Sequence, residues 1–188
     1  MEQVTKEHAE RCLALAWAHE EAQRWSASWN TRLVFPSIVL ATFSGAGAVG
    51  ADQLLPFAGA TTLVGVISLL VGVLQTVQNY FGFAKNAEAH RIAALQYSKM
   101  HAQLSMQLAL PRNERKRAAD IIEIINTERD RLSEIVPILP QAVKDVFGSR
   151  FPDLGEFALP SNLGTLKEVR VTSFEAAKAP PTVMFRTV

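Results

Sequence analysis

The sequence contains two long stretches without a charged side chain: LVFPSIVLATFSGAGAVGA at 33–51 and QLLPFAGATTLVGVISLLVGVLQTVQNYFGFA at 53–84. Asp52 is the one charged residue between Arg32 and Lys85. A helix needs about 20 apolar residues to cross the hydrocarbon core of a bilayer, where backbone groups must bond within their own helix. The sequence therefore predicts an all-α membrane protein with a two-helix transmembrane hairpin (spans 33–51 and about 57–81), long cytoplasmic helical arms and an oligomeric state.

The composition argues against several classes of function. A net charge of +1 over 188 residues does not suit a nucleic-acid binder. The single cysteine, Cys12, gives no internal disulfide framework. The acidic start of the chain is unlike a signal peptide, so the first apolar stretch is expected to stay in the mature protein. With no phosphate loop and no nucleophile motif, we expect neither an enzyme nor a cofactor.

The positive charges predict an orientation. All 19 Lys and Arg residues lie before the first span or after the second. The positive-inside rule then places both termini in the cytoplasm and Asp52 on the other side. Trp25 and Trp29, which precede the first span, suit the membrane interface; packing on the protein's own arms is almost as plausible.

Outside the hairpin of residues 33–84, three regions are expected. Residues 1–32 form an N-terminal amphipathic helix, 85–147 a cytoplasmic helical region, and 148–188 a loosely structured tail with a short strand at 166–174. The first helix should bury one stripe of side chains. That stripe comprises Ala9, Cys12, Leu13, Ala16 and Trp17.

Prolines and a cap residue divide these regions further. Pro36 is expected in the first turn of the first span, where a missing N–H is tolerated. Pro111 should end the helix that continues from the second span, and Asn113 should cap the next helix. Pro137 and Pro140 should end that helix, before a short helix at 141–147.

The second span carries a seam of small or polar residues at alternating spacings of four and three, which places them on one helix face. The seam comprises Thr61, Gly65, Ser68, Gly72, Gln75, Asn79 and Gly82. Such residues let helices approach and hydrogen-bond across an interface. Packing against the Gly-rich end of the first span within one hairpin is the favoured interpretation; in an oligomer the seam would instead line a narrow water-filled path.

Two polar groups outside the membrane have alternative explanations. His8, Cys12 and His19 share one helix face and could hold zinc, although a structural site needs a fourth ligand and such spacings usually arise by chance. A basic cluster could bind anionic lipid headgroups at about 1 kcal/mol per residue, and a solvated helix start explains it equally well. The cluster comprises Arg112, Arg115, Lys116 and Arg117.

Residues 75–81 (QTVQNYF), 87–91 (AEAHR), 93–94 and Tyr97 resemble the signature of the SLATT family. Members of this family are two-transmembrane effectors associated with SMODS nucleotidyltransferases and SLOG nucleotide sensors. The similarity covers residues 5–147, including 108–111 (LALP), and is close to versions in algae and large DNA viruses. The motif positions are Glu88, His90, Arg91 and Tyr97.

The resemblance implies a membrane effector that oligomerises and opens a pore in a conflict or cell-suicide system when a nucleotide signal is sensed. Regulation by a nucleotide-sensing partner in trans and loss of effector activity are both open. It implies no catalytic residues. The chain departs from the family in its tail beyond Gly148 and in having no sensor domain of its own. A non-conducting scaffold, for instance of a viral membrane, remains the alternative. From the residues alone, Glu88, His90 and Arg91 could hydrogen-bond a neighbouring helix or ligand, and a solvated helix face is the favoured interpretation.

Overall fold

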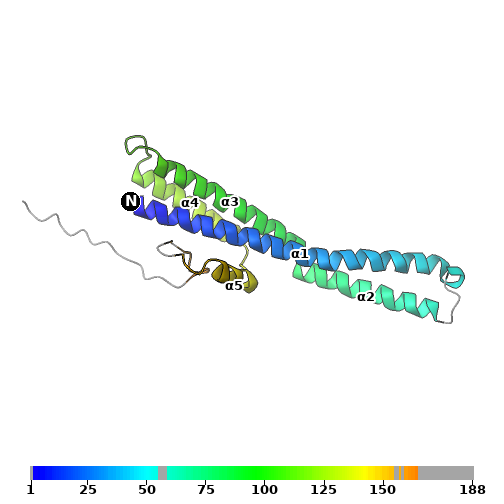
Figure 1. Ribbon diagram of the computed structural model, residues 1–188. Coiled ribbons are helices and arrows are strands. Elements are labelled where there is room, and N and C mark those ends of the chain that lie inside the picture. Colours follow the sequence, from blue (N-terminus) through cyan, green and yellow to red (C-terminus); the bar gives the residue numbers. More distant parts are fainter. Residues whose placement is uncertain (1, 55–58, 155–156, 158, 165–188) are drawn as a thin grey trace, which may run out of the picture.

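The computed structural model describes residues 2–54, 59–154, 157 and 159–164, with side chains of 48–54 not included. Within these residues the protein is all-α, as predicted (Figure 1). Five helices are present: α1 (Glu2–Leu54), α2 (Ala60–Phe81), α3 (Phe83–Ala109), α4 (Ala118–Ile135) and α5 (Gln141–Arg150).

The helices form an elongated molecule with α1 along its whole length (Figure 1). The C-terminal half of α1 pairs with α2, and its N-terminal half packs against α3, with α4 and α5 beside them. The helical hairpin of α1 and α2 therefore projects from a bundle made by the first half of α1 with α3, α4 and α5. We call this bundle the arms.

The first helix is continuous, which corrects the predicted division into an amphipathic helix and a separate span. α1 runs without a break through Pro36, which lies inside it and not in its first turn. A proline in a helix removes one backbone bond, and side-chain hydroxyls bond nearby carbonyls here: Ser37 Oγ donates to Leu33 O and Thr31 Oγ1 to Ala27 O. The arms and the hairpin thus share one uninterrupted helix.

The arms have two hydrophobic clusters on either face of α1. The first joins α1 to α3 and α4; it comprises Ala9, Cys12, Met100, Leu104, Ile125 and Leu132. The second joins α1 to the segment around α5; it comprises Ala18, Ala22, Leu139 and Val143. The predicted stripe is buried at Ala9, Cys12 and Ala16, whereas Leu13 is 45% exposed. Trp17 packs edge-on against Phe147 and Phe151.

The connections between helices differ from the predictions in detail. α3 ends before Pro111 and α4 before Pro137, as expected. α4, however, is capped by Arg117 and not by Asn113, because the loop is held back against α3 by Arg115, whose guanidinium bonds the carbonyls of Leu108 and Leu110. α5 extends to Arg150, into the predicted tail. The predicted strand at 166–174 lies outside the described residues.

One of the two predicted spans meets the criteria of length and composition for crossing a membrane. Among the described residues this is the run of α2 and α3, Ala60–Ala109, and only 11% of its most apolar window is buried. The first predicted span, 33–51, is the C-terminal part of α1. No window among the described residues of α1 meets these criteria.

Candidate functional site

The second helix uses one face to pack on α1. Ala60 and Val71 are buried on this face, and Val64, Ile67 and Leu74 are partly buried. These positions follow one another at spacings of four and three, each one residue before a position of the seam. Since one residue turns a helix by about 100°, the seam lies beside this contact and not within it.

The seam therefore faces outward, which corrects the interpretation that it packs inside the hairpin. Thr61, Gly65, Ser68, Gly72, Gln75 and Asn79 are all exposed, and Gly82 is partly exposed. A Cβ atom added at Gly65 or Gly72 would meet open space. Ser68 reaches the first helix through a hydroxyl–hydroxyl bond with Ser44. In a single copy, most of the seam has no helix packed against it.

The small residues of α1 accommodate α2. Ser44 and Gly47 are buried at the contact, and Gly47 lies directly against the Val64 side chain. A branched side chain of α2 thus fits against bare backbone of α1. The Gly-rich end of α1 serves the hairpin contact as expected, but its partner is the apolar face of α2.

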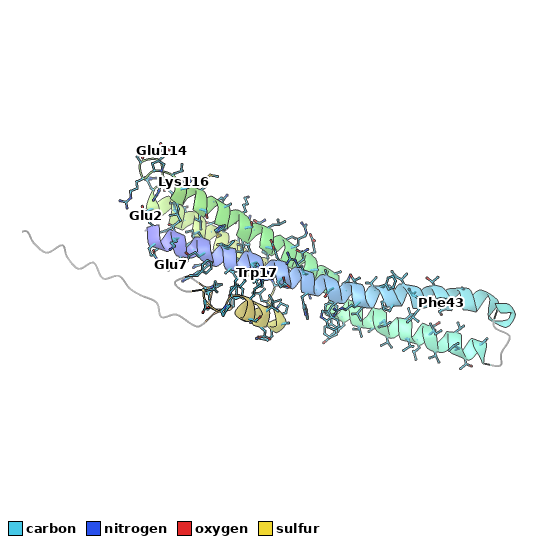
Figure 2. All side chains as sticks on the ribbon, viewed as in Figure 1. Glu2, Glu7, Trp17, Phe43, Glu114 and Lys116 are labelled. Atoms are coloured by element: carbon cyan, nitrogen blue, oxygen red, sulfur yellow. The ribbon has the colours of Figure 1, made fainter. Side chains whose placement is uncertain are left out.

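The remaining surface of the hairpin is strongly apolar. Side chains project from both helices along its length, Phe43 among them (Figure 2). On α1 the exposed large hydrophobic residues are Phe35, Ile38, Val39 and Phe43. On α2 they are Leu63, Val66, Leu69, Leu70, Val73, Tyr80 and Phe81. Large contiguous apolar surface of this kind is typical of a membrane or protein contact.

An aromatic collar of Trp25, Trp29, Phe81 and Phe83 surrounds the junction between the hairpin and the arms. The Trp29 and Phe83 rings are stacked at 6.4 Å between centroids, and Trp25 meets Phe83 edge-on. The Arg32 guanidinium lies 5.3 Å from the Trp29 ring. The tryptophans thus pack on the protein itself, while Trp29 is still 39% exposed at the level suited to a membrane interface.

The four family-motif residues divide into two pairs. Glu88 and Arg91 form an exposed ion pair at 2.7 Å, in agreement with a solvated helix face. His90 does not: it is buried, and its Nδ1 lies 2.9 Å from Nδ1 of His19 on α1. Tyr97 stacks on the His19 ring. Half of the motif therefore builds the α1–α3 interface.

The three residues considered as a possible zinc site, His8, Cys12 and His19, are not brought together. His19 turns toward His90, whereas the Cys12 thiol contacts the Met100 sulfur at 3.0 Å. His8 is partly exposed further along α1. Across the described residues, no group of three or more His, Cys, Asp or Glu side chains is arranged to hold a metal ion.

Burial governs the protonation of the residues at this interface. Burial, with the neighbouring His90, lowers the pKa of His19 to about 4, and burial also lowers the pKa of His90. Burial raises the pKa of the Cys12 thiol to about 11. Both imidazoles and the thiol are therefore uncharged at neutral pH.

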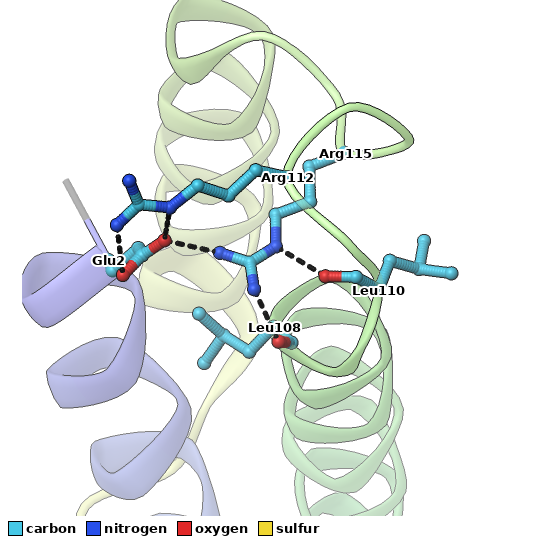
Figure 3. Close-up of polar contacts among 5 residues, drawn as sticks. All are labelled: Glu2, Leu108, Leu110, Arg112 and Arg115. Atoms are coloured by element: carbon cyan, nitrogen blue, oxygen red, sulfur yellow. Dashed lines mark hydrogen bonds and ion pairs between the residues drawn. The ribbon is translucent and has the colours of Figure 1, made fainter.

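The basic cluster lies at the far end of the arms and is engaged with the protein. Arg112 and Arg115 both bind the Glu2 carboxylate, at 2.9 and 2.6 Å, and Arg115 also bonds two carbonyls at the end of α3 (Figure 3). Arg117 pairs with Asp120. The length of α3 separates the cluster from the hairpin by about 40 Å, and headgroup binding by the cluster stays a prediction.

Among the described residues, the side chains provide surfaces for helix packing and a buried polar pair, His19 with His90. The pairing of His19 with His90 has no local sequence signal, because the two residues are 71 positions apart in the chain. The bonds of Arg115 to the Leu108 and Leu110 carbonyls span only seven and five positions, but no sequence pattern marks them. Comparisons of the chain with family models, with curated proteins and with solved structures gave no match.

Proposed function

We propose that this protein is an integral membrane protein with two transmembrane segments, whose copies associate through the α2 seam and enclose a pore. One observation carries the proposal: the small and polar face of the most apolar helix points away from its own hairpin partner, with open space at Gly65 and Gly72. The occupant proposed for this face is a second copy of the chain.

The first segment is proposed to lie in the membrane together with α2. Residues 33–47 of α1 run beside α2, and both helices expose large apolar side chains such as Phe43 and Leu69. If α2 alone lay in lipid, the equally apolar exposed surface of α1 beside it would face water, which is unfavourable. Both termini then lie on the same side, which the distribution of Lys and Arg places in the cytoplasm.

Self-association provides partners for the polar groups of the seam. Gln75 and Asn79 are exposed on α2, and in hydrocarbon their amides would have no water to bond. A facing copy or a water-filled lumen satisfies them, and glycines allow close approach of the backbones. Two helices cannot surround a lumen, so conduction requires several copies.

The resemblance to SLATT effectors gives this proposal a biological setting. In that setting the pore depolarises or kills the cell when a nucleotide-sensing partner acts in trans. The resemblance rests on residues at the end of α2 and along α3, including Gln75, Asn79 and His90.

The second candidate is a non-conducting scaffold. The arms expose several large apolar residues at which partners could dock. These are Ile92, Leu95, Met106, Ile122 and Ile135. A scaffold would use the same seam for packing without a lumen.

Dye release from liposomes separates the two candidates. The full chain is reconstituted with a trapped dye, and insertion and oligomer size are verified by protease protection and cross-linking. For the pore, dye is released, and Gly72→Leu with Gln75→Leu abolishes both release and oligomers. The matched control is Val73→Leu, one residue away on the exposed apolar face, which should change neither.

Intact vesicles, despite verified insertion and oligomers, would favour the scaffold. Because a gated pore could stay closed without its signal, dye uptake is also measured in cells, with and without the neighbouring genes. No uptake in either case, with the oligomer present in the membrane, would reject the pore.

A further inference from the structure

A buried histidine pair links α1 to α3 close to the hairpin, and the proposed pore does not use it. Nδ1 of His19 lies 2.9 Å from Nδ1 of His90, and the two residues are 1% and 2% exposed. The Tyr97 ring stacks on His19, with centroids 5.6 Å apart. The pair lies about 10 Å along the helices from the aromatic collar.

The geometry determines how many added protons break the bond between the two Nδ1 atoms. In the neutral pair one Nδ1 donates a proton and the other accepts it. One added proton can occupy the free Nε2 of the donor ring, and the bond between the Nδ1 atoms remains. A second added proton must occupy the accepting Nδ1. Two N–H groups on two cations would then face each other, so the bond is lost and the rings repel each other.

No opposite charge among the described residues compensates the pair. From α3 it is faced by Tyr97, whose ring stacks on His19. α4 and the segment around α5 pack on α1 and α3 through apolar side chains of the two hydrophobic clusters. Arg131 of α4 bonds Gln96 at the surface. The carboxylates near the pair in sequence are bound by arginines: Glu20 and the partly exposed Glu21 by Arg24, and Glu88 by Arg91.

The chain has a joint beside this pair. α2 and α3 meet at Gly82, which has a left-handed backbone with φ 55° and ψ 37°. A Cβ atom at Gly82 would meet nothing within 4 Å. α1 has no such joint, because it is one helix from Glu2 to Leu54. The backbone can therefore turn at the start of α3 while α1 stays intact.

We propose that His19 and His90 form an acid-sensitive latch, which holds α3 against α1 and releases it, by rotation at Gly82, when both rings are protonated. The latch concerns the arms and does not depend on whether the hairpin conducts. Because the closed state keeps both rings neutral, it is fully stable above the ordinary histidine pKa of 6.5. It weakens as the pH falls from there toward about 4.

The test is a pH series of distances between spin labels on α1 and α3 in the full chain in lipid nanodiscs. Labels are placed at the exposed positions Glu20 and Ile92, in a Cys12→Ala background. The latch predicts a shift to longer distances between pH 6.5 and 4, steeper than a one-proton titration. Unchanged distances over this range would overturn it.

Two variants identify the groups that titrate. His19→Asn with His90→Asn keeps an amide near each Nδ1 and cannot be protonated, so the distance should become independent of pH. If the shift persists there, carboxylates cause it and the latch is rejected. The matched control is His101→Asn: His101 Nδ1 bonds the Ala9 carbonyl across the same helices, 2.9 Å away, as a protonated ring also can. The pH-dependent change in the distance between the labels should therefore remain in the His101→Asn variant.

If the double variant does not fold, the ring nitrogens of the native chain are followed by ¹⁵N NMR. The latch predicts one proton shared by the two Nδ1 atoms and two coupled protonation steps below pH 6.5. Independent titration of each ring near 6.5 would contradict it.

Discussion

Gly47 of α1 lies so close to Val64 of α2 that a Cβ atom at Gly47 would stand 2.8 Å from Val64 Cγ2. Gly47→Ala should therefore overpack the hairpin and destabilise it by about 1–3 kcal/mol. Unfolding in mixed micelles with increasing SDS measures this. Gly45→Ala, which meets open space two residues away, is the control and should have little effect. Equal losses in the two variants would contradict the described contact.

Gly82→Ala should destabilise the junction of α2 and α3. A left-handed backbone costs an alanine about 1–2 kcal/mol, and Gly82 has φ 55°. Gly148→Ala, inside α5 and also in open space, should instead stabilise slightly, because alanine favours a helix. Thermal unfolding followed by circular dichroism distinguishes the two, and a stabilised Gly82→Ala would contradict the left-handed joint.

Arg115→Ala should destabilise the arms far more than Arg112→Ala. Arg115 is 22% exposed and bonds two carbonyls of α3 as well as Glu2, whereas Arg112 is 84% exposed and binds Glu2 alone. Charged hydrogen bonds contribute about 1.5–3 kcal/mol when well placed. Chemical denaturation of the two variants measures the difference, and a larger loss for Arg112→Ala would contradict the predicted ranking.

The ion pairs of Glu2 with Arg112 and Arg115 predict that the stability of the protein depends on pH in the acidic range. Hydrogen bonds and charge from Arg112, with a further contribution from Arg115, lower the pKa of Glu2 below its ordinary 4.5. Their stabilisation is therefore complete above pH 4.5 and is lost as the pH falls through the lowered value. Glu2→Gln should flatten the stability curve in this acidic range, and a curve identical to that of the native chain would reject the role of Glu2.

Cys12 should be almost unreactive in the folded protein. Burial raises the pKa of its thiol to about 11, so very little thiolate exists at neutral pH. A thiol reagent such as Ellman's reagent should label it slowly in the native state and quickly after denaturation. Cysteine placed at the exposed Leu13 in a Cys12→Ala background provides the fast native reference.

The tryptophans should report where the membrane surface lies. Trp29 belongs to the aromatic collar, whereas Trp17 packs on α5 about 18 Å further along α1. Brominated lipids should quench single-tryptophan variants that keep Trp29 and leave those that keep Trp17 bright. Equal quenching of the two would contradict a membrane boundary at the collar.

Helices and their proline ends could be predicted from the sequence, because these signals are local. The ends of α3 before Pro111 and α4 before Pro137 are examples. The continuity of α1 could not be predicted, since a proline usually marks a helix boundary. Pro36 instead lies inside the helix. Asn113 was a plausible cap, but α4 begins at Ala118, after a loop in which Arg115 bonds carbonyls at the end of α3.

The candidate site shows the same division. The seam is a periodic pattern, so its place on one face of α2 followed from spacing. Which face meets α1 did not, because Val64 and Gly65 differ by one residue and both suit a helix contact. His90 looked like part of a solvated face, since its partner His19 lies 71 residues away.

The single helix α1 has a mechanical consequence. At 53 residues it is about 80 Å long, and it crosses from the arms into the hairpin without a joint. A sideways displacement of its Glu2 end is therefore also a change of tilt at its other end. In the proposed membrane topology, a partner that moves the Glu2 end of the arms would therefore also change the tilt of the hairpin in the bilayer.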